Sequence, residues 1–274
     1  MALEKGVLAI LKKFATAFRE ARERGANEAD TVMCLVRFFE EVLGYDSLKG
    51  EISREIPIKD RYCDLALKID GTVCILVEGK AAGTKELVDK HIEQAENYAA
   101  RAGVRWVLLT NGIEWKLYHL TFAEHEGIAH ELAFEANLLE EFESSPEGLW
   151  GKLKYVTRDA VEKEALEDYW SQKKVLSPAS IVRVLFREPV LRAVRRELNR
   201  DAPVRLEIED VFSGIREALS KEAILAAGDI RIKRRKRRKK SGKTASSAPC
   251  PSPEQSERES VTLNVESAEI DLKG

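Results

Sequence analysis

The sequence predicts an α/β domain in which helices flank a mixed sheet. Between residues 3 and 43, apolar residues recur at three- and four-residue steps, as in amphipathic helices. Short β-rich runs meet at the dipeptides Asp70-Gly71 and Asn111-Gly112, which favour hairpins. A helical pattern lies between the two groups of strands. This order of strands, helix and strands is typical of the α/β class.

The first 136 residues contain the expected elements of this domain. Helices are expected over 3–22 and 27–43, the second capped by Asn27, and a third over 85–101, capped by Thr84. Strands are expected over 51–57, 62–69, 73–80, 105–110 and 114–120, with an edge strand over 130–135.

The rest of the chain predicts two further regions. Residues 137–230 form a helical appendage, with helices expected over 137–144, 159–175, 178–199 and 207–226. Residues 231–274 are rich in Lys, Arg, Ser and Pro and predict a disordered basic tail. The predicted domains are therefore 1–136, 137–230 and 231–274.

Composition and charge limit the class of protein. The last 44 residues hold 12 of the 45 basic and 6 of the 47 acidic residues, which leaves residues 1–230 with a net charge of −8. Neither a membrane span nor a secretory signal is visible, so we expect a cytoplasmic protein without a membrane partner. The four cysteines form no CxxC pair, which argues against a zinc knuckle and fits buried thiols in a reducing compartment.

Asp64, Glu78 and Lys80 form the constellation that carries chemistry. Alternate residues of a strand share a face, so Glu78 and Lys80 should point the same way. If the hairpin loop holds the three residues 70–72, Asp64 lies opposite Glu78. Opposed Cβ atoms are about 4.5–5.5 Å apart, close enough for two carboxylates to share a divalent cation. A two-residue loop would oppose Asp64 to Val77 and destroy the arrangement.

Such a triplet predicts phosphodiester hydrolysis. Two neighbouring carboxylates repel each other unless a proton or cation lies between them. Mg²⁺, or Mn²⁺ in its place, is the usual cation where phosphate is the substrate. The metal would activate a water molecule and stabilise charge on the phosphodiester, while Lys80 orients the water or the phosphate. The simpler alternative is a salt bridge between Glu78 and Lys80 at the strand end.

Four segments carry a resemblance to a known family. They are NEADTVMCLVRFFEEVLGYD, CDLAL, VCILVEGKA and HIEQAENYAARAGVRWVLLTNGIEWKLYHL, within residues 27–120. They resemble the N-terminal nuclease domain of type I restriction endonuclease R subunits, in the PD-(D/E)xK superfamily. The residue before Asp64 is Cys63 rather than the proline of the superfamily's name. The resemblance implies a restriction-endonuclease-like sheet.

The resemblance also implies roles for individual residues. Asp64, Glu78 and Lys80 would be the metal-binding and catalytic core, and Glu28 a further metal ligand. Gln94 and Tyr98 match the QxxxY motif of RecB-like members, which lies near the active site. Without the resemblance, Glu28 is simply a first-turn carboxylate favoured by the helix dipole. Gln94 and Tyr98 are then a surface Gln beside a half-buried Tyr, at i,i+4 spacing on one helix face.

The chain departs from a complete R subunit because it lacks a Walker motif. GKAAGTK at residues 79–85 does not have the required spacing. We therefore expect a stand-alone nuclease-like protein, or one whose protein partners supply translocation or specificity.

The predicted tail begins with nine cations in ten positions. Such runs bind nucleic acid by neutralising phosphates and carry no base information. A nuclear localisation signal, an RNA-binding tail and a solubilising tail remain alternatives. The expected nucleic-acid-binding residues are Arg231, Lys233, Arg234, Arg235, Lys236, Arg237, Arg238, Lys239 and Lys240.

Two functions follow from these patterns. The first is a Mg²⁺-dependent nuclease that hydrolyses DNA, in restriction or defence, with RNA as an alternative substrate. The second is a non-catalytic nucleic-acid-binding or adaptor protein that retains the nuclease fold.

Overall fold

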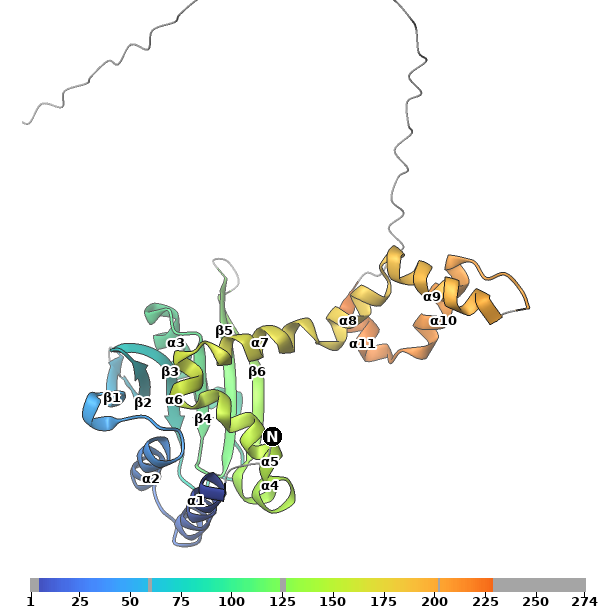
Figure 1. The fold of residues 1–274 in the computed structure, drawn as a ribbon. Helices are drawn as coiled ribbons and strands as arrows, with labels where there is room; N and C mark the ends of the chain where they lie inside the picture. Colours follow the sequence, from blue (N-terminus) through green and yellow to red (C-terminus); the bar gives the residue numbers. More distant parts are fainter. Residues whose placement is uncertain (1–4, 59–60, 124–126, 202, 229–274) are drawn as a thin grey trace, which may run out of the picture. The chain divides into compact units, whose positions relative to one another are not determined.

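A six-stranded mixed sheet forms the centre of the protein, as predicted (Figure 1). The computed structural model describes residues 5–58, 61–123, 127–201 and 203–228. The strands are β1 (Ile52–Ile58), β2 (Arg61–Ile69), β3 (Thr72–Gly79), β4 (Trp106–Thr110), β5 (Glu114–Ala123) and β6 (Gly127–Asn137). They lie in the order of the sequence. β3 and β4 are parallel, and the other neighbours are antiparallel.

Helices precede, interrupt and follow the strands. The helices up to β4 are α1 (Lys5–Glu23), α2 (Glu28–Glu41) and α3 (Glu93–Ala102), with short 3₁₀ turns η1 (Ser47–Lys49) and η2 (Asp89–Ile92). After β6 come α4 (Leu138–Ser144), α5 (Pro146–Leu153), η3 (Lys154–Val156), α6 (Arg158–Glu162), α7 (Ala165–Val175), α8 (Pro178–Leu185), α9 (Glu188–Asp201), α10 (Ile208–Ala218) and α11 (Lys221–Ala227). None of the described helices is long and apolar enough to cross a membrane.

Helices cover both faces of the sheet. On one face Phe18 of α1 and Phe38 of α2 belong to the same core as Trp115 of β5. On the other face Ala95 and Ala99 of α3 pack with strand residues. The right-handed crossover that connects parallel strands explains why α3, between β3 and β4, lies on a face of the sheet. The first core also includes residues of α4, α5 and α7, so the helices just after β6 continue it.

Several predicted element boundaries are wrong. The helix expected over 85–101 begins only at Glu93, because side chains of the β4–β5 hairpin bind carbonyl groups at Thr84 and Leu87. The helix expected over 159–175 is interrupted at Glu164, which has a left-handed backbone. The last two predicted helices are each divided in two. Pro189 requires a new helix start, since proline does not fit a helix interior, and Ser220 caps α11.

The cysteine prediction holds only in part. Cys63 is buried, whereas Cys34 and Cys74 are half-buried, and all three are free thiols. Cys250 and the basic residues 231–240 lie outside the described residues, as does the whole predicted tail.

Candidate active site

Four polar side chains meet where β2 and β3 adjoin the first turn of α2. Asp64 lies on β2, Glu78 is the next-to-last residue of β3, and Lys80 follows that strand directly. Glu28 is the first residue of α2, after the N-cap Asn27. The predicted acid-and-lysine constellation therefore comes together in space, and the early helix adds its carboxylate.

At the site, β2 and β3 pair in the predicted register, but this register arises in a different way. The turn holds only the two residues Asp70-Gly71, not three. However, the register shifts at a β-bulge, in which Cys74 has no partner on β2. Beyond the bulge, Leu65 lies opposite Val77. One step further along this register are the two carboxylates, so the bulge restores the alignment that the shorter turn would have destroyed.

Lys80 lies between two of the carboxylates. Its Nζ is 2.6 Å from Oε1 of Glu78 and 3.7 Å from Oε2 of Glu28. The third carboxylate is held by the backbone, because the N–H of Gly79 donates to Oδ2 of Asp64 at 2.7 Å. The salt bridge that sequence reasoning offered as the simpler alternative is thus present. It belongs to a larger cluster of three acids and one amine.

Glu78 is the most constrained member of the cluster. Its side chain is 4% exposed, and its Oε2 is buried without a hydrogen-bond partner. Burial, followed by the charge of Asp64, raises the pKa of Glu78 to about 7, although Lys80 opposes the shift. Burial alone would lower the pKa of Lys80, but the hydrogen bond from Lys80 to Glu78 and the surrounding negative charge raise it instead.

The donor set suits a hard divalent cation. Carboxylate oxygens are the ligands that Mg²⁺ and Mn²⁺ prefer, and the unpartnered oxygen of Glu78 is available to a ligand. Asp64, Glu78 and Glu28 are the residues that would hold the ion. Across the described ranges, though, no group of three or more His, Cys, Asp or Glu side chains is already arranged around a metal position. The ammonium of Lys80 forms ion pairs with two of these acids, Glu78 and Glu28.

For the two residues of the QxxxY motif, the structure describes only the backbone. Gln94 and Tyr98 lie one turn apart on α3, the crossover helix that packs against the sheet. Their side chains lie outside the described part of the structure, so their expected position near the active site stays a prediction.

Sequence reasoning missed the importance of Gly79. A Cβ atom at this position would lie 2.8 Å from Cγ2 of Val32 and 3.3 Å from Cδ1 of Leu35, both on α2. Glycine therefore allows the helix that carries Glu28 to approach the end of β3. The signal in the sequence was a glycine within an otherwise apolar strand, which often marks a close backbone approach.

Comparison with known protein families gives a match to part of the chain. Residues 33–132 match the family described as the type I restriction enzyme R protein N terminus. The matched segment contains Asp64, Glu78 and Lys80, whereas Glu28 precedes it. No curated protein and no solved structure matches the chain.

Proposed function

We propose that this chain, whose residues 33–132 match the family of type I restriction enzyme R protein N-terminal domains, is a divalent-metal-dependent deoxyribonuclease. One observation carries the proposal. The buried carboxylate of Glu78, which has an unpartnered oxygen, lies at the end of β3 beside Lys80 and next to Asp64 on the neighbouring strand β2. A buried carboxylate oxygen without a partner costs stability, and acids with a raised pKa are typical of functional sites, which supports a functional role for Glu78.

The acids and the lysine of the site would have different roles in the reaction. When bound, the cation would lower the pKa of a water molecule and stabilise negative charge on the phosphodiester. Asp64 and Glu78 would bind that cation, and Glu28 would complete the ligand set. Lys80, released from the carboxylates, would orient the attacking water or the scissile phosphate.

DNA cleavage by the full chain tests the proposal. We expect plasmid and linear DNA to be cut in Mg²⁺ or Mn²⁺, and Asp64→Asn, Glu78→Gln and Lys80→Ala each to lower the rate by about 100-fold or more. The matched control is Glu114→Gln, in the second acid-x-Lys triplet of the described chain, Glu114-Trp115-Lys116. The Lys116 amine binds the carbonyl of Leu87 instead of an acid, so this variant should keep full activity.

Calorimetric titration with Mn²⁺ supplies a measurement that needs no substrate. Wild type should bind the ion and Asp64→Asn should bind it more weakly. The proposal is abandoned if concentrated wild-type protein cuts no DNA with either metal and Glu78→Gln changes neither cleavage nor metal binding.

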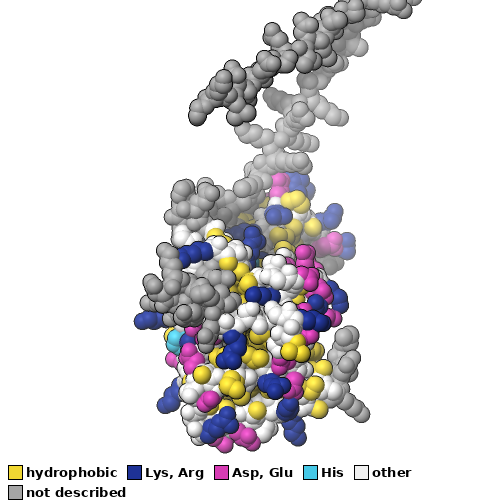
Figure 2. Space-filling view, turned by 90° about the vertical axis from the view of Figure 1, so that its left-hand side faces the viewer, with side chains coloured by type: hydrophobic (Ala, Val, Ile, Leu, Met, Phe, Trp, Pro, Cys, Tyr) yellow, Lys and Arg dark blue, Asp and Glu magenta, His cyan; other side chains and the backbone are white. Residues whose placement is uncertain are grey.

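General DNA affinity is proposed to come from the basic run 231–240. The face that includes β1 and α2 shows acidic and basic side chains interspersed with apolar ones, without a continuous field of either sign (Figure 2). Residues 1–230 carry net negative charge, whereas the run holds nine cations in ten residues. Deleting residues 231–243 should weaken DNA binding by about tenfold or more at low salt and flatten its salt dependence.

A non-catalytic DNA-binding protein is the second candidate. It is favoured by the position of Lys80, whose ammonium group forms ion pairs with both Glu78 and Glu28. In that case DNA binding should persist in EDTA, and no variant of the acidic cluster should alter it. Metal-dependent cleavage that Glu78→Gln abolishes would exclude this function.

A further inference from the structure

A buried threonine joins the two segments that carry Glu28 and Lys80. Thr31 lies in α2, one turn after Glu28, and its side chain is completely buried. Its hydroxyl donates to the carbonyl of Asn27 at 2.8 Å and accepts the N–H of Ala82 at 3.0 Å. The first bond is common for a helical threonine, but the second joins residues 51 positions apart.

The neighbouring packing shows that this contact is part of a close junction. Ala82 is 1% exposed and packs in a cluster with Ala21 and Ala26, which precede α2. On the same side of α2, Val32 and Leu35 lie against the position of Gly79. The N–H of Ala82 therefore has its hydrogen bond inside a buried junction, where losing the acceptor leaves a buried donor unsatisfied.

We propose that Thr31 is a positioning residue of the candidate active site. Its hydroxyl fixes the distance between the first turn of α2, which begins with Glu28, and the segment that follows β3, which begins with Lys80. It touches neither a metal nor a substrate. It determines whether the carboxylate of Glu28 faces the same space as Glu78 and Lys80.

A pair of threonines gives a matched comparison. Thr157 also uses its hydroxyl twice, donating to the carbonyl of Lys154 at 2.8 Å and accepting the N–H of Ala160 at 3.3 Å. Thr31→Val and Thr157→Val each remove two hydrogen bonds with little change in volume. Both should lower stability, but only Thr31→Val should alter the site. Thr31→Ser keeps the hydroxyl and should rescue it.

Zero-length carbodiimide crosslinking on the full chain measures the positioning without metal or DNA. The reagent joins a carboxylate to a neighbouring amine as an amide, with net loss of water. Oε2 of Glu28 lies 3.7 Å from Nζ of Lys80, so wild type should give a Glu28–Lys80 crosslink that mass spectrometry identifies. The Glu78–Lys80 link serves as the internal reference. We expect Thr31→Val to lower the first yield at least fivefold relative to the reference, and Thr31→Ser and Thr157→Val to keep it.

The importance of this positioning for catalysis rests on the proposed nuclease function. A second measurement distinguishes the positioning role of Thr31 from the nuclease function itself. Thr31→Val should also weaken Mn²⁺ binding about tenfold, as loss of an outer-shell contact typically does. A changed crosslink in a protein whose wild type binds no metal and cuts no DNA would refute the nuclease but not the positioning role. An unchanged crosslink yield in folded Thr31→Val, or an equal loss in Thr157→Val, would overturn the positioning role.

Discussion

At the scale of single residues, the candidate site depends on Glu78, an acid whose burial costs stability. Glu78 follows an apolar run and is buried on the strand. Among the described residues, Lys80 binds one of its oxygens and the other oxygen has no hydrogen-bond partner. Gly79 contributes to the geometry of the site in two ways. Its N–H orients Asp64, and its missing side chain admits α2. Three consecutive residues therefore set the charge, spacing and orientation of the cluster.

Gly79→Ala tests the close approach of α2. The added methyl group would meet Cγ2 of Val32 at 2.8 Å, so the Val32 side chain, the helix or the strand end must move. We expect DNA cleavage and Mn²⁺ affinity to fall about tenfold. Adding Val32→Ala makes room for the methyl group and should restore much of both, although the cavity lowers stability by about 1–3 kcal/mol. A double variant no better than Gly79→Ala would refute the steric explanation.

At the scale of elements, the turns determine where the strands end and which helix they meet. The β4–β5 turn is held by the Asn111 side chain, whose Oδ1 accepts the N–H groups of Ile113 and Glu114. Gly112 in this turn has φ +84° and lies against the ring of Phe18 on α1. That ring is buried and packs beside Phe38, so neighbouring side chains restrict its movement. The turn thus fixes α1 on the sheet.

Gly112 and Gly127 have similar backbone conformations, so comparing alanine variants at the two positions distinguishes backbone strain from steric overlap. A Cβ at Gly112 would lie 2.2 Å from the ring of Phe18, whereas one at Gly127, with φ +82°, would meet nothing within 4 Å. Gly127→Ala should lower the free energy of unfolding by about 1–2 kcal/mol through backbone strain alone. Gly112→Ala should lower it by about 3–5 kcal/mol because overpacking adds to the strain. Urea denaturation measures both, and equal losses would contradict the contact with Phe18.

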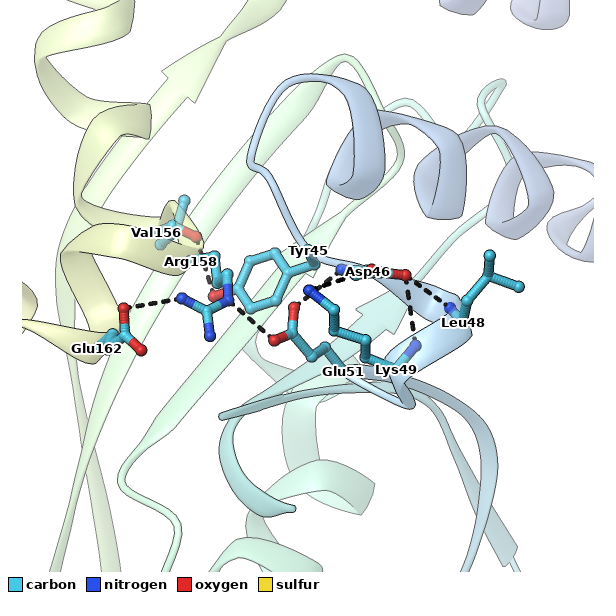
Figure 3. A network of polar contacts seen from close by, with 8 residues as sticks. All are labelled: Tyr45, Asp46, Leu48, Lys49, Glu51, Val156, Arg158 and Glu162. Atoms are coloured by element: carbon cyan, nitrogen blue, oxygen red, sulfur yellow. Dashed lines mark hydrogen bonds and ion pairs between the residues drawn. The ribbon is translucent and has the colours of Figure 1, made fainter. Parts of the chain in front are cut away.

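At the scale of the whole molecule, one ion-pair network joins segments more than 100 residues apart (Figure 3). Nε of Arg158 is 2.9 Å from Oε1 of Glu51, whose other oxygen accepts the N–H of Asp46. The hydroxyl of Tyr45 donates to the carbonyl of Val156 beside it. These bonds fasten the start of α6 to the segment between α2 and β1. The sheet and the helices that follow it therefore share more than apolar packing.

This network predicts how stability depends on pH. Burial alone would raise the pKa of Glu51, but hydrogen bonds from Arg158 and the Asp46 N–H lower it below its ordinary value of 4.5. A lowered folded pKa stabilises the protein above pH 4.5 and loses that contribution as the pH falls through the folded value. Glu51→Gln should therefore unfold more easily than wild type at pH 7, and the difference should shrink below pH 4.5. A difference that is constant between pH 3 and 7, measured by urea denaturation, would contradict this role.

The sequence by itself determined the class of fold and the members of the candidate cluster. Alternating and helical apolar patterns are local signals, so they predicted the strands and the first two helices. The spacing of Asp64, Glu78 and Lys80 likewise predicted that they lie close together on two neighbouring strands. Only the tertiary structure decided the register, because a bulge at Cys74 compensates for the short turn, and a bulge has no clear local signal. It also decided the late start of α3 and the contacts of Thr31 and Gly79, which depend on side chains distant in sequence.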